Sequence, residues 1–230
     1  MIHFAIKPIN LSILLATSLL ATMAIAQDLT QIPPPKSPLV APVPMNADWT
    51  VTVKYPAASS SHPAQPDGRL ISVHSTKTGS FKRDLISYTG GKLDENWYAN
   101  SLFLYANTQG GVSANDMDGD PPPDKADPNP SVANGFPGVA WLRLDRYDRV
   151  VIYEKRPCYH YADENSEAWI DTETGFPVAY KSGDLVFGFT FNASPSSPLT
   201  LPPAYQKAFE FCQGAIDRRK EVSKVLSRRR

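Results

Sequence analysis

Several residue patterns by which enzymes and metal sites are usually recognised are missing from this chain of 230 residues. Only two cysteines occur, Cys158 and Cys212, and their separation excludes a C-x-x-C redox pair. The histidines form no H-E-x-x-H frame and no i, i+4 pair, so they predict no zinc site; His160, between two tyrosines, is typical of an ordinary strand residue. No G-x-S-x-G elbow marks a nucleophile. The sequence therefore predicts a protein that is not an enzyme and has no resident cofactor.

Long apolar runs are also scarce, and the one that stands out lies at the N-terminus. Residues 11–25 are apolar or small and too few for the roughly 20 residues that span a bilayer. Ala24-Ile25-Ala26 fits a small-x-small cleavage site. The pattern predicts a signal peptide at residues 1–26 and a periplasmic or secreted protein.

The chain as a whole has no excess of charge of one sign, since its formal net charge is zero, but its C-terminal end is basic. Residues 217–230 carry seven basic and two acidic side chains. Export argues against a nucleic-acid partner for this basic C-terminal tail. Two interpretations stay open: a frayed, solvated helix end, or a contact with an acidic partner or an anionic membrane surface.

Prolines and aromatic residues indicate the fold class. The 22 prolines are clustered, and because proline cannot donate a ladder hydrogen bond, the clusters mark gaps between strands. Ten tyrosines, ten phenylalanines and four tryptophans favour strands, and apolar and polar residues alternate at 48–55. The sequence predicts a mainly β protein with a C-terminal helix, in which a long antiparallel meander forms a curved sheet or half-barrel.

The expected organisation has four parts. A signal peptide (1–26) and a proline-rich leader or disordered linker (27–46) precede a single antiparallel β-sheet domain (47–216), followed by the basic tail (217–230). An acidic, proline-studded loop at 113–137 interrupts the meander. The second half of the meander is expected to contain six strands, of which the first is Val139–Leu144 and the last is 185–192. A hairpin turn at Thr172–Gly175 has the residues for a type I turn followed by a left-handed glycine.

Several of these strands are apolar on both faces, so something must cover both sides or one side must line a cavity. In one interpretation the helix and proline-rich segments cover the sheet. In the other, a concave face binds a hydrophobic ligand, and the candidate cavity residues are Trp141, Trp169, Leu185, Phe187, Phe189 and Phe191.

Four features together suggest a family. A leader precedes a strand that alternates Trp49, Val51 and Tyr55, then a K-T-G-x-F-K-R-D stretch and a late A-W-I-D-x-x-T-G-x-P-V hairpin. This combination resembles the outer-membrane lipoprotein carrier superfamily. The resemblance implies a half-open antiparallel barrel with a helical lid that holds acyl chains or other hydrophobic groups. The acidic loop and the proline-rich leader depart from that pattern.

The acidic loop itself has the spacing of a calcium site. Carboxylates fall at positions 1, 3, 5, 9 and 12 of a twelve-residue loop, which suits a hard cation that takes six to eight oxygen ligands. Position 6 is Pro121, whose ring forbids the positive φ that a glycine adopts there. Calcium binding and a solvated acidic loop both remain open; the candidate ligands are Asp116, Asp118, Asp120, Asp124 and Asp127.

The two cysteines are expected to pair in an oxidising compartment. A Cys158–Cys212 disulfide would link the last helix covalently to the sheet, and two buried free thiols are the alternative.

Two functions follow from these patterns. The first is an exported soluble protein that binds a hydrophobic small molecule or an acylated protein in the concave face of its sheet. The second is an extracellular structural or interaction module with a calcium-ordered acidic loop.

Overall fold

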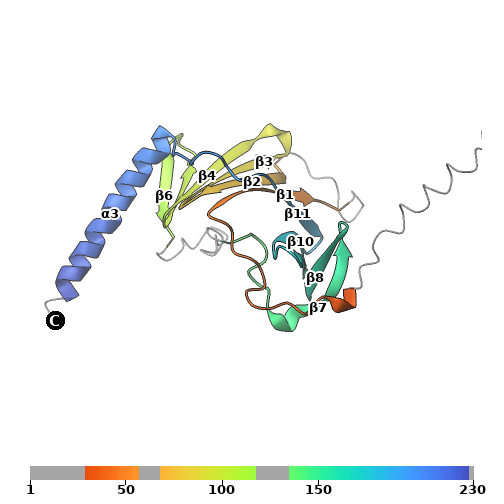
Figure 1. Ribbon diagram of the computed structural model, residues 1–230. Coiled ribbons are helices and arrows are strands. Elements are labelled where there is room, and N and C mark those ends of the chain that lie inside the picture. Colours follow the sequence, from red (N-terminus) through yellow and green to blue (C-terminus); the bar gives the residue numbers. More distant parts are fainter. Residues whose placement is uncertain (1–28, 57–67, 118–134, 228–230) are drawn as a thin grey trace, which may run out of the picture. The chain divides into compact units, whose positions relative to one another are not determined.

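Alternation of apolar and polar residues along short segments builds a mainly β fold with one C-terminal helix, as the sequence predicts (Figure 1). The computed structural model describes residues 29–56, 68–117 and 135–227. Its strands are β1 (Asn46–Lys54), β2 (Leu70–Thr78), β3 (Phe81–Tyr88), β4 (Leu93–Ala99), β5 (Leu102–Ala106), β6 (Val112–Asp116), β7 (Tyr147–Tyr153), β8 (Arg156–Asp163), β9 (Ser166–Asp171), β10 (Pro177–Ser182) and β11 (Leu185–Phe191). Three short 3-10 turns and one helix complete the described elements: η2 (Leu29–Gln31), η3 (Thr89–Gly91), η4 (Leu144–Arg146) and α3 (Pro203–Ser227).

All eleven strands belong to one antiparallel sheet in the order β6-β5-β4-β3-β2-β1-β11-β10-β9-β8-β7. Strands β1–β6 form one meander and β7–β11 a second. The first and last strands pair with each other and join the two meanders, with Trp49 opposite Phe191 and Val53 opposite Phe187. The sheet is therefore open, and β6 and β7 form its edges within the described residues.

The sheet is curved. Tyr98 on β4 and Tyr180 on β10 line the same cleft although five strand spacings separate their strands. In a flat sheet those strands would lie about 24 Å apart, since neighbouring strands are spaced by about 4.8 Å. We call the face that carries Trp49, Val51 and Phe189 the concave face, and the opposite face the convex face.

The topology explains why the connection between β6 and β7 is long. These consecutive strands lie at opposite edges of the sheet, so their connection has to span the distance between the two edges. Residues 135–144, the crossover segment, run against the concave face, where Phe136 and Val139 are buried. The expected strand Val139–Leu144 is wrong: these residues form turns and the start of η4, and Val139, Trp141 and Leu142 pack onto the sheet. Conversely, all of β6 except Val112 falls in the range 113–137 that the sequence predicts to be a loop.

The proline-rich leader is not a free linker in its second half. Residues 34–45, the strap, lie against the concave face, with Val43 buried and Leu39 and Val40 packed on the same cluster. Backbone hydrogen bonds hold the strap at two points: the Ala41 N–H donates to the Gly175 carbonyl at 2.8 Å, and the Met45 carbonyl accepts from Gly79 at 2.8 Å.

The turn between β9 and β10 has the predicted form. Gly175 adopts φ +70°, and its N–H donates to the Asp171 carbonyl at 2.9 Å. The Asp171 carboxylate accepts from the N–H groups of Glu173 and Thr174 at 2.9 and 2.8 Å. The left-handed glycine therefore closes the hairpin and also presents the carbonyl to which the strap binds.

Helix α3 covers the convex face at the other end of the sheet. Tyr205 and Ile216 are buried against Trp97, Leu102 and Leu104. The Tyr205 hydroxyl donates to the Glu95 carbonyl at 3.0 Å. The helix continues through Ser227, so residues 217–227 of the predicted basic tail are helical.

Candidate functional site

Most of the concave face between β1 and β7 is filled by the chain itself. The Phe136 ring of the crossover segment packs against Trp49 and Phe191, with centroids 5.5 Å away in each case, and against Phe189 at 6.0 Å. The strap covers the same cluster. Proline-rich segments therefore cover this part of the sheet, as one of the two sequence interpretations expects.

Gly138 fits the crossover segment tightly onto this face. It adopts φ +75°, and a Cβ atom built there would lie 2.3 Å from the Tyr180 ring. Only glycine allows the backbone to approach the ring so closely. The Tyr180 ring in turn stacks on Phe187 at 4.3 Å.

Beyond the Tyr180–Phe187 stack, the concave face holds a cleft of about 190 Å³. It lies over β1 to β4 and is bounded on one side by β10, β11 and the crossover segment. Its apolar walls are Val51, Val53, Leu70, Val73, Ile86, Pro137, Tyr180 and Phe187. Ser75, Lys82, Asp84, Asn96 and Tyr98 make its other wall polar. The cleft is thus amphipathic.

The polar wall is organised by Asp84. Its carboxylate accepts the Ser75 hydroxyl at 2.7 Å and pairs with the Lys82 ammonium at 3.1 Å. Both ionic side chains are nearly inaccessible, with 4% of Lys82 and 9% of Asp84 exposed. The Lys82 ammonium also lies 4.3 Å from the centroid of the Tyr98 ring. Burial, and then the Asp84 charge and hydrogen bond, raise the pKa of Tyr98 well above its usual range, so the phenol stays a donor.

A second lysine adjoins this wall. Lys77 sits opposite Lys82 in the β2–β3 register and therefore on the concave face. It is only 9% exposed, and within the described ranges no carboxylate or other acceptor lies at bonding distance from its ammonium. Burial, together with the positive charge of Lys82, lowers the pKa of Lys77. Removal from water and a like charge both disfavour its ammonium form, which an anion bound there would stabilise.

The structure distributes the predicted cavity residues over three places. Leu185, Phe187, Phe189 and Phe191 alternate onto the concave face of β11, but only Phe187 lines the cleft. Trp141 belongs to the crossover segment, packs on the concave-face cluster and donates its indole N–H to the Gly138 carbonyl at 2.9 Å.

Trp169 lies on the convex face, because it alternates with Ala168 and Ile170, whose register partners Tyr180 and Tyr159 are on the concave side. Neither Lys77, Lys82 nor Asp84 was expected from the sequence. The signal available was strand alternation, which places Lys77 on one face with Val73 and, in the next strand, Lys82 and Asp84 on one face with Ile86.

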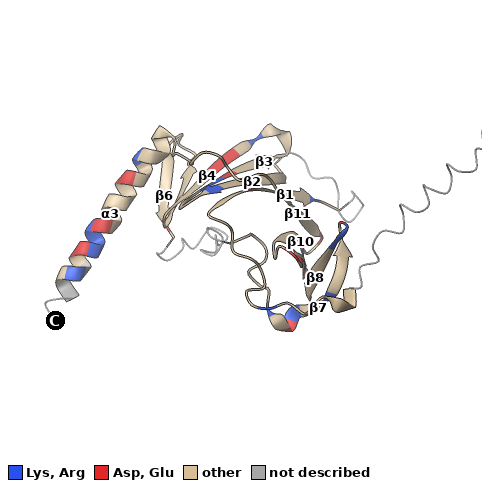
Figure 2. Ribbon diagram, in the orientation of Figure 1, with Lys and Arg blue, Asp and Glu red and all other residues tan. Residues whose placement is uncertain are grey.

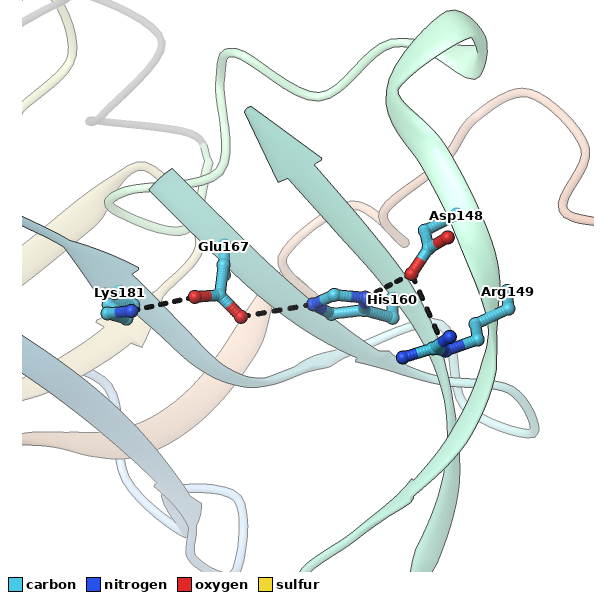
Figure 3. Close-up of polar contacts among 5 residues, drawn as sticks. All are labelled: Asp148, Arg149, His160, Glu167 and Lys181. Atoms are coloured by element: carbon cyan, nitrogen blue, oxygen red, sulfur yellow. Dashed lines mark hydrogen bonds and ion pairs between the residues drawn. The ribbon is translucent and has the colours of Figure 1, made fainter. Parts of the chain in front are cut away.

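On the convex face, polar side chains from four neighbouring strands form a continuous row (Figure 3). The His160 ring on β8 has its Nδ1 atom 3.1 Å from Asp148 of β7 and its Nε2 atom 3.2 Å from Glu167 of β9. Lys181 of β10 donates to Glu167 at 2.7 Å, and Arg149 pairs with Asp148 at 3.5 Å. His160 thus uses both ring nitrogens inside the row, which ties the strands together.

Aromatic stacking supports this row. Trp169 stacks on His160 with centroids 5.4 Å apart and on Tyr153 at 4.5 Å. The hydrogen bond from Lys181 lowers the pKa of Glu167, outweighing the burial that opposes it. The predicted cavity residue Trp169 is therefore part of a strand-bridging surface.

A second convex-face cluster centres on Asp48. Its carboxylate accepts from Asn192 at 2.7 Å and from Thr76 at 2.9 Å, and lies 2.9 Å from His74 Nε2. Burial by itself would raise the pKa of Asp48, but these hydrogen bonds outweigh it and lower the pKa. The cluster ties β1 to β2 and to the end of β11.

The expected disulfide is wrong: Cys158 and Cys212 are free thiols. Cys158 is buried on β8, whereas Cys212 lies on α3 against β6, with its Sγ atom 3.8 Å from the Ala114 carbonyl. Nine strand spacings separate β8 from β6, and a disulfide requires Cα atoms within about 7 Å. Burial, and then the nearby Asp171, raise the pKa of Cys158 to about 11.

Of the candidate calcium ligands, Asp116 ends β6, and the other four aspartates lie outside the described residues. In the part of the chain that the structure describes, no three histidine, cysteine or carboxylate side chains gather as a metal site would require. The calcium loop stays a prediction.

Comparison with protein-family models and with curated proteins finds no match to the chain.

Proposed function

We propose that the protein binds an amphipathic ligand with an anionic group, such as a fatty acid, in the cleft of its concave face. The ligand's apolar part would lie against the valine, isoleucine and phenylalanine wall, and its anionic group would bind the Lys77 ammonium beside the Lys82–Asp84 pair. The observation that carries the proposal is the amphipathic cleft with a buried cation next to it.

Charge on this wall favours an anion over a neutral or cationic ligand. The Asp84 carboxylate is already paired with Lys82, and Lys77 adds a further positive charge beside this pair. An anionic group would replace the water that Lys77 loses on burial and would form a charge-assisted hydrogen bond.

The size of the cleft limits what can enter as the protein stands. A volume of about 190 Å³ is below the range of about 300–1,000 Å³ typical of small-molecule sites. We infer that a longer acyl chain would extend past Pro137 and displace part of the crossover segment. The open curved sheet is also the architecture that the resemblance to the lipoprotein carrier superfamily implies, and the signal-peptide pattern would place the protein outside the cytoplasm.

The test is fluorescence titration with cis-parinaric acid and with its methyl ester, which has the same chain without the charge. We expect the acid to bind more tightly than the ester. Lys77→Met should weaken acid binding by about 10- to 100-fold, since hydrogen bonds to charged groups contribute about 1.5–3 kcal/mol, and should leave ester binding unchanged.

Two variants of β1 test the location. Val53→Phe would fill the cleft and should abolish binding of both probes. Thr52→Phe places the same ring on the exposed convex side of the same strand and should change neither affinity. If the unmodified protein binds neither probe, the proposal is wrong; if acid and ester bind equally, the role of Lys77 is wrong.

A further inference from the structure

Helix α3 has one apolar stripe that the fold uses. Tyr205, Phe209, Cys212 and Ile216 recur at intervals of three or four residues and pack against β4 to β6. This stripe fixes the first part of the helix on the convex face. The C-terminal part extends past edge strand β6 (Figure 1).

A second apolar stripe on α3 faces solvent. Phe211 is 76% exposed, Val222 59% and Val225 51%. At 100° per residue these three side chains fall within a sector of about 60°. That sector is separate from the packed stripe, because Phe211 and Ile216 differ by about 140° around the helix axis. Leaving a phenylalanine three-quarters exposed has no benefit for the fold, so this stripe is available to another surface.

Positive charge accompanies the second stripe. Arg218, Arg219, Lys220 and Lys224 lie in the exposed C-terminal half of the helix, against Asp217 and Glu221 (Figure 2). Arg218 falls inside the apolar sector, between Phe211 and Val222 along the helix. In the sequence three further arginines follow at 228–230.

We propose that α3 docks the protein on an anionic lipid bilayer, with Phe211, Val222 and Val225 inserted at the headgroup boundary and Arg218 and Arg219 on lipid phosphates. An exposed helix with a phenylalanine–valine stripe and flanking arginines has the chemistry of an interfacial helix that lies in the membrane plane. Arginines beside the stripe can extend their long side chains to the headgroups while the apolar residues enter the acyl region. None of the helices among the described residues is long and apolar enough to cross a membrane.

The charge pattern disfavours a second copy of the chain as the occupant. In a parallel pair of these helices, Arg218 would meet Arg218 inside the apolar contact. An anionic surface instead pairs with Arg218 inside the apolar sector and with Arg219 beside it. The docking surface lies on the convex side of the sheet, so it is independent of the ligand cleft.

The experiment is co-sedimentation of the protein, including its proline-rich leader, with lipid vesicles. One set of vesicles is phosphatidylcholine alone, and the other contains an equal part of phosphatidylglycerol. We expect binding to the anionic vesicles and its loss in high salt. Phe211→Ser/Val222→Ser should weaken this binding at least about tenfold, because it removes apolar side chains that enter the bilayer. Arg218→Glu/Arg219→Glu should separately weaken it at least about tenfold, because each basic residue near an anionic surface contributes appreciably.

Matched controls separate docking from net charge and from folding. Lys54→Glu/Arg143→Glu changes the net charge equally, at side chains 63% and 66% exposed elsewhere on the protein, and should bind like the unmodified chain. All variants should keep the same urea midpoint, because the substituted residues are exposed. Equal binding of all variants, or binding lost as much in Lys54→Glu/Arg143→Glu, would overturn the proposal, as would a dimer that Phe211→Ser/Val222→Ser dissociates.

Discussion

The buried Lys82–Asp84 pair should be among the most sensitive points of the sheet. At 3.1 Å the two charges attract by about 5 kcal/mol at an effective dielectric constant of about 20. Removing one partner leaves the other charge buried, which typically costs about 3–5 kcal/mol. We expect Lys82→Met to cost about 3 kcal/mol, the lower end of that range, because Asp84 keeps the hydroxyl donors of Ser75 and Tyr98.

A double-mutant cycle isolates the pair. In Lys82→Met/Asp84→Asn neither charge of the pair remains, and the asparagine carbonyl can still accept from Ser75. The double variant should therefore cost at least about 2 kcal/mol less than the sum of the single variants. Urea unfolding at neutral pH, followed by tryptophan fluorescence, gives the four free energies of unfolding.

An exposed pair provides the control. Lys54 and Glu154 are 3.6 Å apart with side chains 63% and 50% exposed, so Lys54→Met should cost less than about 1 kcal/mol. The reasoning is refuted if Lys82→Met costs no more than Lys54→Met, or if the two single effects in the buried pair add within about 0.5 kcal/mol.

Three further outcomes follow from single contacts. The Tyr161 hydroxyl is buried without a hydrogen-bond partner in the described structure, so Tyr161→Phe should raise the unfolding free energy. Tyr205→Phe should lower the unfolding free energy by about 1 kcal/mol, because the Tyr205 hydroxyl donates to a carbonyl. Urea unfolding measures both changes. The pKa of Glu167 is lowered in the fold, so its ion pair stabilises the protein above the unfolded pKa near 4.5, and this contribution is lost as pH falls through the folded value. Glu167→Gln should therefore lower the unfolding free energy by under about 1 kcal/mol at pH 7, since the pair is about one-third exposed, and should have no effect at about pH 2. An equal cost at both pH values would contradict the assignment. Cys212 should react with a thiol reagent faster than Cys158 in the folded protein, and both should react in denaturant; a native protein without titratable thiols would mean that a disulfide forms after all.

Local patterns predicted the strands well where one face is buried and the other is wet. The alternation at Trp49, Val51 and Val53 gives β1, and the sequence around Gly175 gives the turn that the structure contains. Alternation failed at Val139–Leu144, where apolar residues serve a segment that packs across the sheet. A short apolar run alone does not distinguish a strand from a covering loop.

The candidate site was predicted only in outline. Sequence reasoning placed Phe187 on a face that could bind an apolar ligand, and that residue does line the cleft. It also grouped Trp169 with the same face, because strand alternation fixes a residue's side only relative to its own strand. Assigning faces across strands requires the register, which depends on contacts far apart in the sequence.

The sequence by itself determined the fold class, the strand-rich body, the β9–β10 turn and the C-terminal helix, because these depend on contacts between near neighbours along the chain. Only the tertiary structure decided that β1 pairs with β11, that β6 and β7 therefore lie at opposite edges of the sheet, and that the strap and Phe136 fill one half of the concave face. The same long-range pairing left the other half as a cleft beside Lys77 and placed the two cysteines too far apart to bond. The β1–β11 pairs join residues separated by more than a hundred positions, and no local pattern specifies which of the available apolar faces will meet.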